Sequence, residues 1–487
     1  MLSAIRAERG ITMSTAKIKK TTVDFTEGRI SGKLIKFALP LMATALLQSF
    51  YNAADMMVVG NFADNGAFAM GAVGACGSLI NLFTSFFLGL SAGVGVCVAQ
   101  NIGAKRFNNV KSYVHTAALM SLICGIVVGI VGFFATETML GWMGTPDELI
   151  DEAAQYMRVV FIGMPAALIY NFMASALRSS GDSKRPLIFL AISGFANVVI
   201  NFVMVLGFGM GAVGVGIATA ISNYLSAVLI VAFMLRTSGP CRLYLRELKM
   251  KAQMIMGIMQ NGIPTGFQSV VFGISNTLIQ VSINTFGAIA VTGSGAANNI
   301  EGFIYVAMNA ISIATITVVS QNVGATKYER IKRVMLVSIV FVSAVGILMA
   351  GLILLFNQPL LTIYAPGEEN AAVRDQGFIK LLIVGGPYFL CGIMECVSGA
   401  LKGMGRSVIS MVVSIIGSCA LRIVWIYTLC PLFPDNIGVL YLAYPVTWII
   451  TTSGLAVFVV RGYREMIRRR DMRLAKEAEF DPEKSMA

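Results

Sequence analysis

The residues most able to do chemistry lie inside long apolar stretches of the sequence. Gln48, Asn52 and Asp55 are spaced i, i+4 and i+7, so on a helix their side chains share one face. An ionisable residue in a membrane span costs at least about 2.5–3.5 kcal/mol and usually faces a cavity or a partner. A carboxyl group held there can bind and release a proton, or hold Na⁺ when it is ionised. We therefore expect Asp55 to be functional; the alternative is a structural cap or ion pair.

Two later apolar stretches offer polar partners for this carboxylate. Asn197 and Asn201 are one helical turn apart, and so are Thr219 and Asn223. We expect these side chains to face Asp55 within one bundle of helices. The alternative is hydrogen bonding that only packs the helices together.

The second half of the chain carries a different set of polar groups. Asn276 and Gln280 lie in a stretch without an acid, and the acids of this half are Glu301 and Glu395. At 1.5 Å per residue, Arg422 lies nearer in depth to Glu301 than to Glu395. We expect a Glu301–Arg422 pair, as a salt bridge, a gate or a substrate contact. Glu395 is then either protonated or lines the cytoplasmic mouth, and Asn276 and Gln280 belong to the same pathway.

The composition requires membrane-spanning helices to position these groups. Hydrophobic residues make up 56 % of the 487 residues and charged residues only 13 %, about half the share of a soluble domain. Apolar runs of about 20 residues are long enough to cross a bilayer as helices. This excludes a soluble enzyme, a disordered chain and a fibrous protein. We predict twelve spans, at roughly 34–62, 71–101, 112–134, 156–178, 186–208, 212–235, 254–286, 294–322, 334–356, 377–401, 408–430 and 438–460.

Positive charges alternate between the loops. Of the 37 Lys and Arg, all but Arg158, Arg374, Lys380 and Arg422 fall at the two ends of the chain or in every second loop. Because positive loops stay in the cytoplasm, we expect a multi-pass protein of the inner (cytoplasmic) membrane with both termini cytoplasmic. The net charge of +12 is then no sign of nucleic-acid binding. Met13 offers a second candidate start.

The chain also repeats itself at a period of about 222 residues. Gln100-Asn101-Ile102-Gly103-Ala104 recurs as Gln321-Asn322-Val323-Gly324-Ala325, and Pro40 recurs as Pro264. Two parallel repeats of six spans indicate two pseudo-symmetric bundles, as in carriers, and the paired prolines indicate helix bending. The predicted regions are a cytoplasmic tail over 1–33, a six-helix bundle over 34–236, a cytoplasmic linker over 237–253, a second six-helix bundle over 254–460 and a cytoplasmic tail over 461–487.

Several activities find no support in the residues. His115 is the one histidine, and the eight cysteines form no Cys-x-x-Cys pair, so a zinc enzyme or a histidine-based triad is close to excluded. No Walker motif occurs, which leaves ATP-driven pumping unsupported. We expect no enzyme activity, no cofactor and no metal other than a possible Na⁺ at Asp55.

The chain resembles the MATE (multidrug and toxic compound extrusion) transporters over about residues 30–460. The segments that carry the resemblance, in their order along the chain, are Ala38-Leu39-Pro40 with Gln48 and Tyr51-Asn52-Ala53-Ala54-Asp55, Ala99-Gln100-Asn101-Ile102-Gly103-Ala104, Ala176-Leu177-Arg178 with Gly181-Asp182, and Gly211-Ala212-Val213-Gly214 with Ile217-Ala218-Thr219. No single segment identifies the family, but their order and the duplicated Gln-Asn-x-Gly-Ala are specific for it.

The resemblance implies an all-α fold of twelve transmembrane helices in two six-helix bundles around a central cleft. It also implies efflux of organic, often cationic, compounds driven by inward H⁺ or Na⁺. Asp55, Asn201 and Thr219 match the coupling site of the DinF-like branch, whereas Val205 stands where that branch has a second Asp. The NorM-like branch uses a Glu in the seventh span, and this sequence has none there. We expect a DinF-like monomer coupled to H⁺ or Na⁺, with H⁺ preferred.

The expected mechanism is exchange, in which protonation of Asp55 from outside alters its contacts with the fifth and sixth spans and releases the drug outward. Acids such as Glu301 and Glu395 favour lipophilic cations as substrates. The alternative function is a flippase for a lipid or a lipid-linked sugar, in the related superfamily. Those clefts are typically lined with Arg and Lys, whereas Arg422 is the only clearly mid-span cation here.

Overall fold

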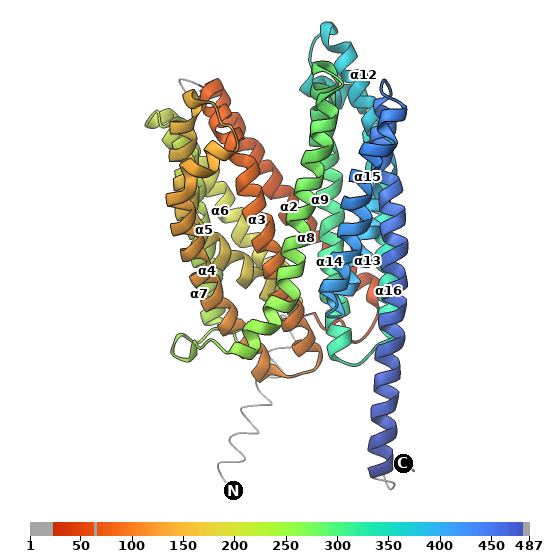
Figure 1. Ribbon diagram of the computed structural model, residues 1–487. Helices are drawn as coiled ribbons and strands as arrows, with labels where there is room; N and C mark the ends of the chain where they lie inside the picture. The colour runs from red at the N-terminus through yellow and green to blue at the C-terminus, as the bar shows by residue number, and fades with distance from the viewer. Residues whose placement is uncertain (1–22, 63–65, 481–487) are drawn as a thin grey trace. The chain divides into compact units, whose positions relative to one another are not determined.

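The computed structural model describes residues 23–62 and 66–480, and every element in these ranges is helical (Figure 1). The parts of the expectations that concern residues 1–22, 63–65 and 481–487, including the second start at Met13, lie outside the described residues. The first six long helices are α2 (Ile30–Phe62), α3 (Gly66–Gly103), α4 (Phe107–Trp142), α5 (Asp147–Ser179), α6 (Lys184–Phe202) and α7 (Gly211–Arg236). A π-helix, η1 (Val203–Gly207), directly extends α6.

The second half repeats this order with more interruptions. Its helices are α8 (Ala252–Asn284), α9 (Ala288–Gly324), α10 (Glu329–Leu355), the short α11 (Asn357–Tyr364), α12 (Ala371–Lys380), α13 (Phe389–Gly403), α14 (Ser407–Ser414), α15 (Leu421–Thr428) and α16 (Ile437–Phe480). Shorter helical turns connect them, namely η2 (Leu245–Glu247), η3 (Glu368–Asn370), η4 (Leu381–Gly385), η5 (Gly386–Tyr388), η6 (Ile415–Ala420) and η7 (Cys430–Leu432).

These elements confirm the all-helical membrane fold. Among the described residues, eleven helical segments are long and apolar enough to cross a membrane. The seventh predicted span, 254–286, corresponds to α8, which is not one of the eleven; it is 33 residues long and carries several Asn and Gln side chains. Two of these spans contain a π-helical turn: η4, followed by the 3₁₀ turn η5, joins α12 to α13, and η6 joins α14 to α15.

The two predicted prolines, Pro40 and Pro264, differ in their local structure from Pro387. Pro40 lies inside the unbroken α2 and Pro264 inside the unbroken α8. The hydroxyl of Thr44 donates to the carbonyl of Pro40 at 2.7 Å. By contrast, Pro387 has non-helical backbone angles, so the helical path breaks between η4 and α13. Proline removes a helix hydrogen bond, and only at Pro387 does this end the regular helix.

The chain divides into two compact units. Of the described residues, unit 1 contains 23–24, 36–62, 66–102 and 106–270, and unit 2 contains 25–35, 103–105 and 271–480. The division therefore falls inside α8, after Val270. The first turns of α2 belong to unit 2, and the rest of α2 belongs to unit 1.

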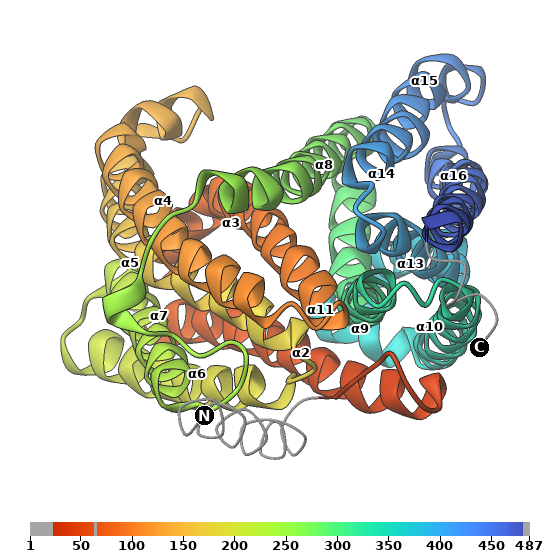
Figure 2. The ribbon, with the colours of Figure 1, turned by 90° about the horizontal axis from the view of Figure 1, so that it is seen from below.

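Unit 1 is held together by close helix packing. α5 contacts both α4 and α7 (Figure 2), and its apolar residues Phe161, Phe172 and Met173 are buried in the core. A Cβ at Gly125 of α4 would meet Pro165 of α5 at 2.5 Å, so only glycine permits this approach.

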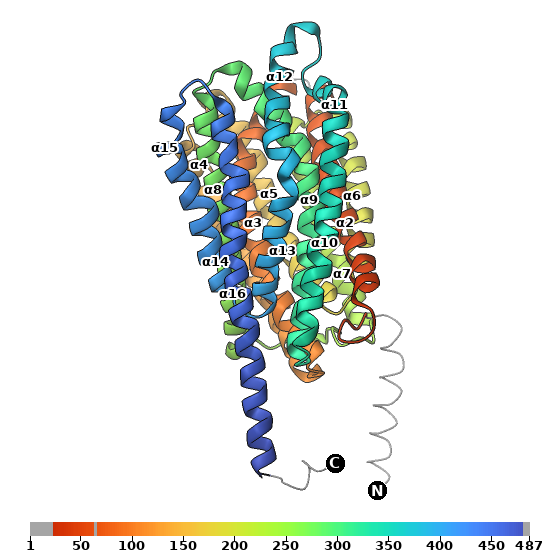
Figure 3. The ribbon, with the colours of Figure 1, turned by 90° about the vertical axis from the view of Figure 1, so that its right-hand side faces the viewer.

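Unit 2 is built around α9 and α13. α13 contacts α9, α10 and α16, and Figure 3 shows it between α10 and α16. The hydroxyl of Ser312 in α9 donates to the carbonyl of Glu395 in α13 at 2.8 Å. α16 runs on beyond its neighbours, where Arg470 pairs with Glu329 and Arg406 with Glu465.

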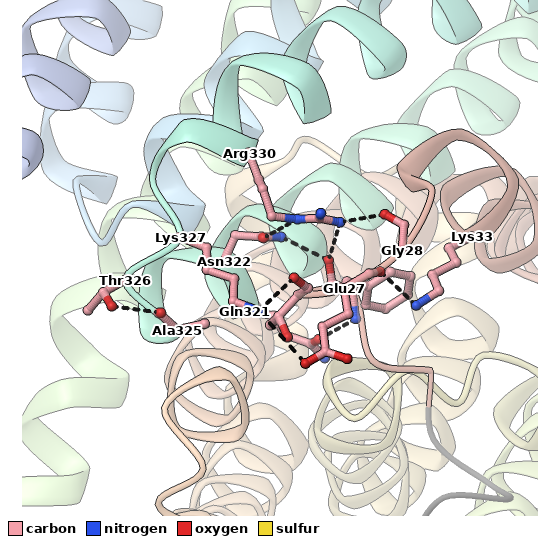
Figure 4. Close-up of polar contacts among 11 residues, drawn as sticks. Glu27, Gly28, Lys33, Gln321, Asn322, Ala325, Thr326, Lys327 and Arg330 are labelled. Carbon is pink, nitrogen blue, oxygen red and sulfur yellow. Dashed lines mark hydrogen bonds and ion pairs between the residues drawn. The ribbon is translucent and has the colours of Figure 1, made fainter. Parts of the chain in front are cut away.

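A strap formed by residues 25–29 is fixed to the turn between α9 and α10 (Figure 4). Gln321 accepts a hydrogen bond from the amide of Phe25 at 3.2 Å, and Asn322 donates to the carbonyl of Phe25 at 3.3 Å. Arg330 donates to the carbonyls of Phe25 at 3.3 Å and of Gly28 at 2.9 Å. In unit 2 the repeated Gln-Asn-x-Gly-Ala segment therefore serves to anchor the start of α2.

Candidate functional site

The polar centre of unit 1 is a contact between α2 and α6. The amide nitrogen of Asn201 donates to the carboxylate of Asp55 at 2.5 Å, and also to the carbonyl oxygen of the Asn197 side chain at 3.4 Å. Asn201 is completely buried, and Asn197 is buried beside it. Asp55 makes no ion pair with any described Lys or Arg. The carboxylate is therefore free to change its protonation state or its counter-ion.

Close backbone approach brings α2 and α6 together at this level. A Cβ added to Gly194 of α6 would lie 1.9 Å from the ring of Tyr51 in α2. The Tyr51 hydroxyl donates to the carbonyl of Ala191 at 3.3 Å. Glycine at 194 thus makes room for an aromatic ring one turn before Asp55 and fixes the distance between the two helices.

The helix that carries Asn201 changes its winding directly after it. η1 begins at Val203, and Val205 inside it is buried. π-helical turns inside α-helices occur frequently at functional sites. The side-chain oxygen of Asn201 is buried and accepts no hydrogen bond from the described residues. An unsatisfied buried carbonyl oxygen beside a carboxylate can accept a hydrogen bond from a protonated group, or it can coordinate a cation.

The other residues predicted for this site are not bonded to Asp55. Thr219 in α7 is half-buried and makes no side-chain hydrogen bond with a described residue. Gln48 and Asn52 are exposed on α2. Tyr156 of α5, which the sequence analysis missed, is buried and interacts electrostatically with Asp55. Its signal in the sequence was weak, because a lone Tyr near the start of an apolar stretch usually marks the membrane interface.

Unit 2 contains a cavity of ≈ 220 Å³. Its wall includes both predicted acids and the predicted arginine. The complete set of lining residues is Phe272, Asn276, Asn298, Glu301, Gly302, Tyr305, Tyr388, Cys391, Met394, Glu395, Arg422, Tyr444 and Trp448. Gln280 is not among them, and its amide donates to Asn284 at 3.2 Å instead.

The expected Glu301–Arg422 pair was wrong. Within the described residues Arg422 forms no ion pair; its Nε donates to the hydroxyl of Thr447 at 3.2 Å and its Nη1 to the side-chain oxygen of Asn276 at 3.2 Å. The guanidinium carbon also lies 4.4 Å from the centre of the Tyr444 ring. Arg422 follows the π-helix η6, so counting depth along a straight α-helix could not give the direction of its side chain.

The cation that acts on Glu301 is Lys380. Lys380 is only 1 % exposed, and its ammonium donates to the hydroxyl of Ser294 at 3.0 Å and to the side chain of Asn298. In the sequence Lys380 is one of the few charges outside the positive loops, and we predicted no role for it. A Lys within an apolar stretch was the available signal, since such a residue needs an internal partner.

Comparison with known proteins places this architecture among transporters. The MatE family model matches residues 40–203 and 264–428. The probable multidrug resistance protein YoeA of Bacillus subtilis (strain 168) is 25 % identical over 438 residues, which are 88 % of this chain and 92 % of that protein. Sequence similarity thus extends through both halves of the chain.

Two solved structures share the fold. A MATE crystal structure in complex with MaL6 gives a TM-score of 0.84 at 18 % identity and covers 91 % of this chain and 99 % of that one. The outward-facing structure of a multidrug resistance MATE family transporter of the MOP superfamily gives 0.83 at 18 % identity, with 92 % and 100 % coverage.

Proposed function

The chain belongs to the MatE family, whose members are multidrug efflux transporters, and from this premise we propose that it exchanges inward H⁺ or Na⁺ for outward organic compounds by alternating access. The observation that carries the proposal is the partly buried hydrogen bond between Asn201, which is itself buried, and Asp55 in unit 1. It gives the transporter an ionisable group that has no basic partner among the described residues.

Proton coupling at this site works through a change of hydrogen-bond roles. An ionised Asp55 accepts the hydrogen bond from Asn201, whereas a protonated Asp55 becomes a donor. The Asn201 side chain then turns its oxygen, which has no donor among the described residues, toward the carboxyl group. This reversal changes the contact between α2 and α6 and biases the unit between two conformations.

Na⁺ coupling uses the same oxygen atoms. A hard cation prefers oxygen ligands, and the Asp55 carboxylate and the side-chain oxygens of Asn201 and Asn197 lie together. Thr219, with Gln48 and Asn52, forms an outer set that completes the site only after a movement of α2 or α7. The missing second carboxylate at Val205 departs from the DinF-like pattern and leaves one negative charge, which fits one monovalent ion, H⁺ or Na⁺.

The substrate pathway includes the cavity in unit 2. Glu301, Glu395, Arg422 and Asn276 line it, and Gln280 lies further along α8. Pro40 and Pro264 provide bending points in α2 and α8. The protein acts as a monomer in the cytoplasmic membrane, with both termini in the cytoplasm, and uses the ion gradient rather than ATP.

Vesicles containing the purified protein test the proposal. An inward gradient of H⁺ or of Na⁺, imposed separately, is expected to drive a fluorescent organic cation against its own gradient. Empty vesicles provide the control. A transport rate that depends on neither gradient contradicts the proposal. Movement of a labelled lipid across the membrane instead favours the flippase. The flippase is less supported, because the family match and the name of the similar protein concern multidrug transport.

A further inference from the structure

The charges around the cavity of unit 2 are unevenly balanced. Glu301 interacts electrostatically with Lys380, and Glu395 interacts with Lys402. Arg422 has only neutral hydrogen-bond partners, namely Thr447 and Asn276. Each acid facing the cavity thus interacts with a lysine outside the cavity lining, whereas the one cation among the described lining residues has no acid bonded to it.

Arg422 is therefore the group that most needs a ligand. It is only 5 % exposed, and a buried charge without a counter-charge is costly. Its Nη2 donates to no described residue, although the guanidinium lines the cavity. The planar fork of a guanidinium binds a carboxylate through two parallel hydrogen bonds. An anionic group of this shape satisfies the free side of Arg422.

The acids of the cavity lack donors in turn. The Glu301 side chain is 5 % exposed and accepts no hydrogen bond from a described residue, and its Oε1 is buried. Glu395 lines the same cavity without a side-chain hydrogen bond among the described residues. An ammonium group supplies three donors and a positive charge. The ammonium group of a ligand would therefore be held by these two acids, and its anionic group by Arg422.

The remaining wall is aromatic. Tyr305, Tyr388 and Trp448 line the cavity, and aromatic rings provide a large apolar contact surface. The volume of ≈ 220 Å³ is below the roughly 300–1,000 Å³ of sites for drug-sized ligands. The ligand is therefore small, of the size of an amino acid.

We propose that this cavity binds a small zwitterion, with its carboxylate on Arg422, its ammonium toward Glu301 and Glu395, and its apolar body against the aromatic wall. The inference rests on the proposed function, since it names a class of compound that the transporter carries. A purely cationic substrate, as the sequence alone indicates, would meet the uncompensated charge of Arg422 in this cavity.

Calorimetric titration of the full-length protein in detergent tests the proposal with three related probes. L-phenylalanine carries both charges, 3-phenylpropionate only the carboxylate and 2-phenylethylamine only the ammonium. Phenylalanine is expected to bind most tightly, and 2-phenylethylamine most weakly, by about tenfold or more for the lost charge-assisted contact. Absence of saturable phenylalanine binding, or equal or tighter binding of 2-phenylethylamine, overturns the proposal.

Variants identify the two ends of the ligand. Arg422→Gln is expected to weaken the binding of phenylalanine and 3-phenylpropionate together, by about tenfold or more. Glu301→Gln is expected to weaken the binding of phenylalanine and 2-phenylethylamine but not that of 3-phenylpropionate. Arg422→Lys keeps the charge but loses the fork and is expected to give an intermediate loss. Arg374→Gln is the control, because Arg374 bonds the carbonyls of Ala365 and Gly367 outside the cavity. Unchanged binding in both Arg422 variants contradicts the assignment.

The outcomes separate this inference from the proposed function. If the protein transports a fluorescent cation along an ion gradient but does not bind phenylalanine, only the zwitterion site is ruled out. If it binds phenylalanine but shows no gradient-driven transport, only the ion-coupled function is ruled out.

Discussion

The side-chain amide of Asn201 donates a hydrogen bond to the carboxylate of Asp55, and this bond joins α6 to α2 inside unit 1. Asn201 also bonds Asn197, one turn earlier on its own helix. Because the amide can either donate or accept, the contact can report whether Asp55 is ionised. The coupling proposed for the transporter depends on this one bond.

Removing the amide should weaken the response to the ion. Asn201→Leu keeps the approximate volume but removes the donor to a charged acceptor, a contact with a typical value of about 1.5–3 kcal/mol. The ion concentration for half-maximal transport should shift by roughly tenfold or more. Initial rates in vesicles over a series of H⁺ or Na⁺ concentrations measure this. Asn171→Leu is the control, since the Asn171 amide bonds only the carbonyl of Ala167 on its own helix.

Filling the space at Gly194 should separate α2 from α6. The new Cβ of Gly194→Ala would overlap the Tyr51 ring, and overpacking of this kind costs about 1–3 kcal/mol. A lower melting temperature in detergent and slower transport are expected. Gly74→Ala in α3 is the control, because nothing lies within 4 Å of its Cβ position. Equal melting temperatures for the two variants would show that the helices do not approach this closely.

The strap should loosen when Arg330 loses its charge. Arg330→Gln removes the hydrogen bonds to the carbonyls of Phe25 and Gly28. Amide hydrogen exchange across residues 23–29 should then become about fivefold or more faster, as expected for loss of a charge-assisted bond. Arg333→Gln changes an exposed arginine of the same helix and should leave this exchange unaltered. Slow exchange in both variants would contradict the anchoring role.

The loop after α7 should detach from α4 in acid. Lys111 bonds the Glu247 carboxylate at 2.5 Å and holds the pKa of Glu247 below its usual range. A lowered folded-state pKa stabilises the attached loop above the ordinary pKa of Glu, and this contribution is lost as pH falls through the lowered value. The protection factors of the amides in residues 237–251, which correct exchange for its intrinsic dependence on pH, should fall on acidification of the native protein. In Glu247→Gln these protection factors should already be lower at neutral pH and should respond less to acid.

The helices and the Asp55–Asn201 contact could be predicted from the sequence, whereas the charge partners of unit 2 could not. Asp55 and Asn201 lie on stretches whose order and periodicity place them in one bundle. The rotation of Arg422 depends on the π-helical turn η6, and one extra residue per turn redirects every side chain after it. Lys380 ends α12 just before η4, so its burial likewise depends on a local change of winding that hydropathy does not reveal.

Transport by Asp55→Asn under separate H⁺ and Na⁺ gradients tests most directly whether Asp55 couples transport to an ion, with Glu137→Gln as a control for loss of an exposed acid. We expect Asp55→Asn to fold and reach the membrane but no longer to couple transport to either gradient, while Glu137→Gln transports normally. Transport by Asp55→Asn that still follows one of the gradients at the native rate would show that Asp55 is not the coupling residue.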